Sequence, residues 1–125
     1  MKIKTVMSIK AIVVIFFGFG FLFLTKTFMS LYGMNIDSGG ITTGRLLGQM
    51  YTLIAFLLWL CRNTTESSTK KAYAISVTIG DAIGTVVCIL AVLSGAMNAL
   101  GWSAVAIYLV LTLGFGYFLI KPEVA

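Results

Sequence analysis

Four long apolar runs constrain the fold of this 125-residue chain more than any other feature. They cover about residues 8–26, 43–61, 72–96 and 101–120. Each is close to the ~20 residues that an α-helix needs to cross the hydrocarbon core of a bilayer. Because the apolar residues are continuous and do not alternate with polar ones, helices are favoured over the strands of a membrane barrel. The sequence predicts an all-α membrane protein, a four-helix transmembrane bundle that forms one integral membrane domain over residues 1–125.

The composition argues against several other classes of protein. Hydrophobic residues make up 59% of the chain and charged residues 10%, whereas soluble domains are about a quarter charged. The net charge is +5, but the basic residues lie in short segments between the apolar runs, so we expect no nucleic-acid partner. Cys61 and Cys88 form no CxxC motif and are expected to be free thiols.

The sequence also lacks the patterns of catalytic and metal-binding sites. There is no His, the commonest general base and metal ligand. Asp81 is the only acid inside an apolar run, since Glu66 and Glu123 lie in the flanks. No paired carboxylates, nucleophile–base set or phosphate loop is evident. We therefore expect no enzymatic activity, no catalytic residue, no metal and no cofactor.

The first apolar run has the outline of a signal peptide, because three lysines precede the stretch 11–24. The segment Thr25–Phe28 that follows offers no small-residue cleavage site, so we expect an uncleaved first helix. With the N-terminus inside the cell, seven Lys or Arg residues lie on the inner side and two, Lys26 and Arg45, on the outer side. The inner residues are Lys2, Lys4, Lys10, Arg62, Lys70, Lys71 and Lys121. This excess predicts a multi-pass protein of the cell (inner) membrane with both termini in the cytoplasm, N-in and C-in.

Asp81 is the residue that least fits a membrane-spanning helix. It lies ten positions beyond Lys71, or ~15 Å along a helix, which is near the bilayer midplane. A charge there costs on the order of 2.5–3.5 kcal/mol, so such residues usually face the bundle interior and have a partner. Thr78, Thr85 and Cys88 share its helix face and form a polar stripe with it.

Arg45 is the predicted partner of Asp81. Arg45, Gln49 and Thr52 have the spacing i, i+4, i+7, which places them on one face of the second spanning helix. Arg45 lies higher than Asp81 by a gap of ~10 Å, most of which an extended Arg side chain can close, and Gln49 is nearly level with Asp81. We expect a buried Arg45–Gln49–Asp81 cluster between the second and third spanning helices.

Three interpretations of this cluster stay open. In the structural one, its polar groups hold the helices together. In the functional one, Arg45, Gln49, Thr52, Asp81 and Thr85 line the path of a ligand or ion. In the third, Asp81 is protonated and has no partner.

Small residues and tyrosines add two expectations about packing. The GxxxG patterns Gly44–Gly48 and Gly80–Gly84 predict close helix approaches beside the charged residues. The tyrosines within the spans each need a hydrogen-bond partner or water for the hydroxyl, and Tyr51 is expected to border the polar site. These tyrosines are Tyr51, Tyr108 and Tyr117.

The first half of the chain resembles a group of bacterial membrane proteins. The segment Leu31-Tyr32-Gly33-Met34 is followed by Asp37 and then by Gly44-Arg45-Leu46-Leu47-Gly48 at the start of a helix. This order is similar to the DoxX-like small four-helix membrane proteins and related membrane domains of unknown function. In them a first helix ends in a "YG" segment, here Tyr32-Gly33, and a second helix opens with Arg-x-x-Gly, here Arg45–Gly48. The resemblance covers about residues 10–60 and implies a four-helix bundle, no established activity and no role for Asp81.

Two functional hypotheses follow from the sequence. The leading one is a non-enzymatic protein of the lipid bilayer that acts as a subunit or accessory through helix–helix association, in a homo-oligomer or a larger membrane complex. The alternative is a small-solute or proton-coupled carrier or channel, with a polar intramembrane site formed by Arg45, Gln49 and Asp81.

Overall fold

The computed structural model of the chain describes residues 2–125. Its helices are α1 (Ile3–Phe23), α2 (Thr25–Leu31), α3 (Ser38–Cys61), α4 (Ser67–Leu93) and α5 (Gly101–Ile120), and a 3-10 turn follows at Pro122–Val124. Over the described range 2–125 no residue belongs to a strand. The helices α1, α3, α4 and α5 are each long and apolar enough to cross a membrane. The predicted all-α four-helix bundle is thus confirmed, and the protein is a small multi-pass membrane protein.

Three of the long helices begin before the apolar runs do. The first residue of α1 is Ile3, of α3 Ser38 and of α4 Ser67, each about five residues ahead of the corresponding run. A formed helix extends into polar sequence because every added residue contributes one backbone hydrogen bond. The start of α3 is fixed by Asp37, whose carboxylate accepts a hydrogen bond from the Gly40 N–H at 2.8 Å.

The two ends of α4 have identifiable local causes. At its start, the exposed Glu66 carboxylate accepts hydrogen bonds from the hydroxyls of Thr69 at 2.6 Å and Ser68 at 2.8 Å. These hydrogen bonds, chiefly the one from Thr69, hold the pKa of Glu66 below its ordinary value. At its other end α4 stops at Leu93, because Gly95 adopts a φ of 80°, a conformation that terminates helices.

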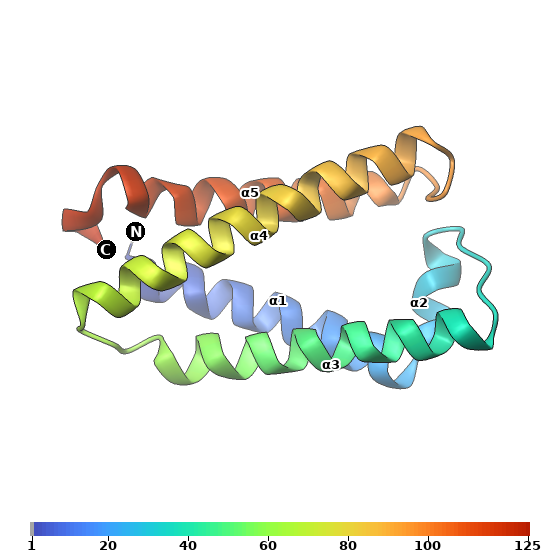
Figure 1. Cartoon of the computed structure of the whole chain (residues 1–125), viewed down its shortest axis with the longest axis horizontal. Coiled ribbons are helices and arrows are strands. Elements are labelled where there is room, and N and C mark those ends of the chain that lie inside the picture. The colour runs from blue at the N-terminus through green and yellow to red at the C-terminus, as the bar shows by residue number, and fades with distance from the viewer. Residues whose placement is uncertain (1) are drawn as a thin grey trace.

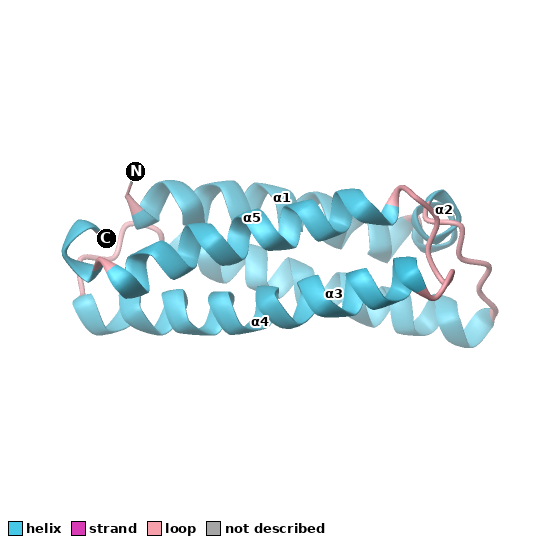
Figure 2. Cartoon of the chain, turned by 90° about the horizontal axis from the view of Figure 1, so that it is seen from above, coloured by secondary structure: helices cyan, strands magenta, loops and turns pink. Residues whose placement is uncertain are grey.

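The four long helices form two antiparallel pairs. α1 packs against α3 and α4 packs against α5, whereas the contacts between the two pairs are few. In Figure 1 the α4–α5 pair lies above the α1–α3 pair, and both termini lie at one end with the α3–α4 connection. We call this end the terminal end. The opposite, distal end carries α2 and the α4–α5 connection (Figure 2).

Glycines allow α1 and α3 to approach closely. A Cβ atom added at Gly48 of α3 would lie 2.7 Å from both the Gly18 carbonyl oxygen and the Leu22 backbone nitrogen of α1. A Cβ atom at Gly18 would in turn lie 2.8 Å from Oγ1 of Thr52. The lack of side chains at these two positions is what brings the backbones together, as in other small-residue helix contacts.

The two helix pairs meet mainly at their ends. At the terminal end, one buried cluster draws side chains from all four long helices: Ile3, Val6, Met7, Ala11, Leu58, Ala74, Val77, Phe115 and Phe118. At the distal end, Asn98 of the α4–α5 connection donates hydrogen bonds from its side chain to the Leu31 carbonyl and from its backbone to the Tyr32 carbonyl, both at 2.9 Å. Between these ends the two pairs make few contacts.

Candidate functional site

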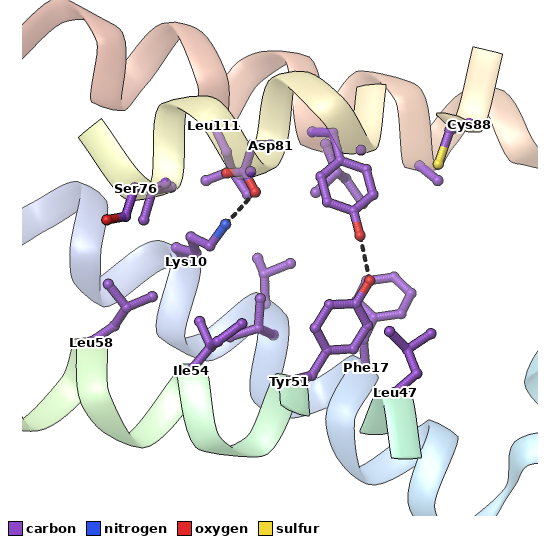
Figure 3. A pocket seen from close by; sticks show the side chains of 18 of the residues that line it. Lys10, Phe17, Leu47, Tyr51, Ile54, Leu58, Ser76, Asp81, Cys88 and Leu111 are labelled. Carbon is purple, nitrogen blue, oxygen red and sulfur yellow. Dashed lines mark hydrogen bonds and ion pairs between the residues drawn. The ribbon is translucent and has the colours of Figure 1, made fainter. Parts of the chain in front are cut away.

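A cavity of about 1110 Å³ lies between the two helix pairs. Side chains of all four long helices line it, joined near the distal end by Met29 of α2 and by Met34 and Met97 of the two connections. Most of the lining is apolar, and Figure 3 shows Phe17 and Ile54 among the side chains around it. Pockets for drug-sized ligands measure roughly 300–1,000 Å³ and are mostly apolar, so this cavity has the size and character of a ligand site.

The cavity is open at its edge between α3 and α4, which make few contacts with each other. Lining residues on both helices are exposed at this edge, including Leu57 of α3 at 48% and Val87 of α4 at 58%. Along α4 the lining extends from Ser68 to Cys88, a length of ~30 Å at the rise of an α-helix. The cavity is therefore an elongated groove about as long as the hydrocarbon core is thick.

An ion pair between Lys10 of α1 and Asp81 of α4 crosses the cavity. The Lys10 ammonium donates a hydrogen bond to Oδ1 of Asp81, and Figure 3 shows the two side chains pointing toward each other from opposite helices. Lys10 is 6% exposed and Asp81 4% exposed. The structure thus joins the two helix pairs through a buried pair of opposite charges.

The ion pair leaves hydrogen-bonding capacity unused. Within residues 2–125, Oδ2 of Asp81 and Oγ1 of Thr78 are buried and have no hydrogen-bond partner. A Lys ammonium has three protons to donate, and the described residues provide Lys10 with one acceptor. A buried polar atom without a partner costs about 1–3 kcal/mol, so these atoms have hydrogen-bonding capacity that a further polar group can satisfy.

A second polar contact crosses the cavity nearer the distal end. The hydroxyls of Tyr51 on α3 and Tyr108 on α5 are hydrogen-bonded to each other (Figure 3). Both tyrosines line the cavity that contains Asp81. The prediction that these two hydroxyls find a partner is confirmed. Tyr51 borders the cavity that contains Asp81, but Arg45 and Gln49 of the predicted polar site do not. Cys88 also lines the cavity and is a free thiol.

The predicted pairing of Asp81 with Arg45 is wrong. Arg45 is exposed and lies at the distal end in a surface hollow with Thr25 and Ile41. Gln49 is also exposed, and neither it nor Arg45 lines the cavity. The reason is that the glycine face of α3, next to these side chains, packs against α1, so that α3 does not present them to α4.

The remaining predicted polar residues also occupy different surroundings. Thr52 is half-buried against α1, where its hydroxyl donates to the Gly48 carbonyl at 2.8 Å. Thr85 is buried one turn beyond Asp81 and donates to the Asp81 carbonyl at 2.8 Å. Of the predicted Arg45, Gln49, Thr52, Asp81 and Thr85 set, the structure therefore brings only Asp81 and Thr85 into contact.

The two GxxxG patterns contact different partners. In α3, Gly44 faces the side chain of Thr25 and Gly48 faces the backbone of α1. In α4, a Cβ at Gly84 would lie 2.9 Å from the ring of Tyr108, whereas one at Gly80 would have no atom within 4 Å. Gly80 borders the cavity. The patterns therefore do not join α3 to α4, and Gly80 packs against no helix in the described chain.

Lys10 is the functional candidate that sequence reasoning missed, because the charge count assigns it to the basic residues of the inner side. Since α1 begins at Ile3, Lys10 lies seven residues, or ~10 Å, inside the helix. The sequence did contain a signal for this pairing, which is the direction of the helices. The first and third spanning helices start on the same side of the membrane and run in the same direction. A basic residue in the first part of α1 can therefore lie level with an acid near the middle of α4.

No protein-family model, curated protein or solved structure matches this chain significantly. Among residues 2–125 there is also no group of three or more His, Cys, Asp or Glu side chains that could hold a metal ion. The features of the molecule that bear on its function are therefore the cavity and the two polar contacts that cross it.

Proposed function

We propose that this protein is a non-enzymatic membrane protein that binds a lipophilic small molecule in the cavity between its helix pairs. The observation that carries the proposal is the cavity itself, which has a volume of about 1110 Å³ and a mostly apolar lining. A few polar groups set in an apolar wall are the usual means by which proteins orient such ligands. The opening between α3 and α4 gives a ligand dissolved in the bilayer a route into the cavity.

This proposal develops the carrier hypothesis and changes its residues. Lys10, Asp81, Tyr51 and Tyr108 take the place of Arg45 and Gln49 as the polar groups of the intramembrane site. A carrier must bind its cargo before moving it, and the cavity would be the site at which that binding occurs. Membership of the DoxX-like group remains a proposal that rests on Tyr32-Gly33 and Arg45–Gly48.

A second candidate function is that of an accessory subunit in a larger complex or a homo-oligomer. It is favoured by the length of the groove, which at ~30 Å along α4 equals the span of a transmembrane helix. A helix of a partner protein would then lie between α3 and α4. This candidate predicts that a protein chain, and no small molecule, occupies the groove.

Filling the cavity tests the leading proposal. Gly80 borders the cavity and a Cβ there meets no atom within 4 Å, so Gly80→Trp adds a large side chain at a position where its first atom lies in open space. We expect its affinity for the neutral lipophilic dye N-phenylnaphthylamine to fall about tenfold or more. Binding is measured by dye fluorescence with the purified protein in lipid nanodiscs, after subtraction of empty nanodiscs.

Leu113→Trp is the matched control, because Leu113 is 65% exposed on α5 and does not line the cavity. It adds the same side chain to the lipid-facing surface and should bind the dye like the unaltered protein. Equal binding by all three proteins would exclude the cavity as the site. Absence of saturable dye binding, together with a protein that co-purifies from native membranes and is lost in Gly80→Trp, would favour the accessory subunit.

A further inference from the structure

We infer that the ligand carries an uncharged head group with both a hydrogen-bond donor and an acceptor, such as a hydroxyl or a primary amide. Lys10 and Asp81 hold this head group, and a long apolar body lies along the groove. The inference rests on the proposed function, because it names the class of molecule that the cavity binds.

The charges around the cavity favour a neutral head group. Lys10 and Asp81 are the only Lys, Arg, Asp or Glu residues among the described residues that line the cavity, and their opposite charges cancel. Both are less than a tenth exposed. A cationic or anionic head group would leave one charge without a counter-charge in an apolar environment, which is costly. An uncharged head group keeps the site neutral.

The unused hydrogen-bonding atoms of the pair specify what the head group must offer. Oδ2 of Asp81 is an acceptor with no partner within residues 2–125, and the Lys10 ammonium keeps two protons beyond the one it donates to Oδ1. Oδ2 is buried in the structure, and the last torsion of an Asp side chain is soft. Rotation of the carboxylate brings Oδ2 to the cavity and at the same time moves Oδ1 away from Lys10. A ligand hydroxyl then bridges the two side chains by donating to Oδ2 and accepting from Lys10, whereas an ether can only accept.

The position of the pair along the groove sets the space for the apolar body. On α1 the lining runs from Lys10 to Phe21, eleven residues or ~16 Å toward the distal end. At the terminal end the buried cluster of all four long helices closes the space between the pairs. A head group at Lys10 and Asp81 therefore leaves room for a long alkyl chain on the distal side.

A set of dodecyl probes with one apolar body and different head groups tests this inference. Dodecanol, dodecanamide, dodecyl methyl ether, dodecanoate and dodecyltrimethylammonium compete with N-phenylnaphthylamine at equal mole fractions in nanodisc membranes. We expect dodecanol and dodecanamide to bind about tenfold or more tightly than the ether, which is the effect of one hydrogen bond to a charged group. The two ionic probes should bind less tightly than dodecanol.

Each contrary outcome has a distinct meaning. If the ether equals the alcohol, or an ionic probe binds more tightly than dodecanol, the inference is overturned and the lipophilic binding site stands. If neither the dye nor any dodecyl probe binds, the proposed function is overturned as well. This series uses the unaltered protein, so its result does not depend on the folding of a variant.

Asp81→Asn provides a second measurement, which separates recognition of the ligand from a purely structural role. The amide oxygen still accepts from Lys10, but a donor replaces the free acceptor. The alcohol-to-ether affinity ratio should therefore fall about tenfold or more, and dodecanoate should gain affinity because Lys10 loses its counter-charge. A structural role would alter all affinities alike and leave the ratio unchanged, which would overturn the inference.

Asp37→Asn is the matched control for this variant. Asp37 is the N-cap of α3 and lies outside the cavity lining, and Asn is an equally good N-cap. The same carboxylate-to-amide change at this position should leave the alcohol-to-ether ratio as it is in the unaltered protein.

Discussion

Lys10 on α1 and Asp81 on α4 are both buried within helices that are otherwise apolar, and each supplies the counter-charge of the other. Removing one partner of such a pair costs far more than replacing both, because the remaining charge is then buried alone. The pair is also one of the few contacts that join the two helix pairs between their ends. Its energetic role can therefore be measured separately from its proposed role in ligand recognition.

We expect Lys10→Met to lower the free energy of unfolding by about 3 kcal/mol or more, since it leaves the Asp81 carboxylate without a counter-charge. The single variant Asp81→Leu should be destabilised as well, since it leaves Lys10 without a counter-charge. The double variant Lys10→Met with Asp81→Leu should be considerably more stable than either single variant, because both charges are gone. Unfolding by SDS in mixed micelles, followed by tryptophan fluorescence, gives these values. Arg45→Met is the control and should change the free energy of unfolding by less than about 0.5 kcal/mol, since Arg45 is exposed. Strict additivity of the two single changes would show that the pair is not coupled.

At the scale of elements, α3 and α4 carry the same glycine spacing but use it differently. Gly48 of α3 lies against the backbone of α1, which cannot move away as a flexible side chain can. Gly80 of α4 borders the cavity and has open space around it. The same substitution at the two positions should therefore have opposite consequences for stability.

Gly48→Ala should lower the free energy of unfolding by about 1–3 kcal/mol, because its Cβ overpacks the contact between α1 and α3. Gly80→Ala should leave stability unchanged or raise it by up to about 1 kcal/mol, since Ala favours the helix and meets no atom there. The SDS titration used for the ion pair measures both. Equal effects of the two substitutions would contradict the packing of α1 on α3.

At the scale of the whole molecule, one end of the bundle carries most of the basic residues. The terminal end brings both termini and the α3–α4 connection together (Figure 1). The basic residues in these segments and in the adjoining first turns of α1 and α4 are Lys2, Lys4, Arg62, Lys70, Lys71 and Lys121. Lys and Arg are enriched in short cytoplasmic segments, so we propose that the terminal end faces the cytoplasm and that the protein resides in the cell (inner) membrane.

Reporter fusions test this orientation. A reporter that is active only in the cytoplasm should be active when fused after Ala125, and one that is active only outside should be active when inserted after Asn35. Both positions lie in connecting or terminal segments at opposite ends of the bundle. Activity with the reverse pattern would place the basic end outside and contradict the proposed orientation.

The sequence by itself determined the number of long helices, because a continuous apolar run of about 20 residues is a local property that one helix satisfies alone. It also identified Asp81 as the residue that needs a partner and Tyr51 as its neighbour in the cavity. It did not identify Lys10. The helix α1 begins at Ile3, in a polar segment that the apolar pattern does not mark as helical, so the sequence did not show that Lys10 lies well inside the helix.

Only the tertiary structure decided which helix faces which. Neighbouring residues of a helix point about 100° apart, so the side chains that meet depend on how each helix is rotated and on which neighbour it packs against. Here the contact of Gly18 with Gly48 joins α3 to α1 and leaves Arg45 exposed. With α3 packed on α1, Lys10 of α1 is the residue that pairs with Asp81. The remaining space between the helix pairs is the cavity. The GxxxG spacing of Gly44 and Gly48 predicts a close helix approach but does not specify the partner helix. That choice depends on the backbone contact with Gly18 of α1, which exists only once the chain has folded.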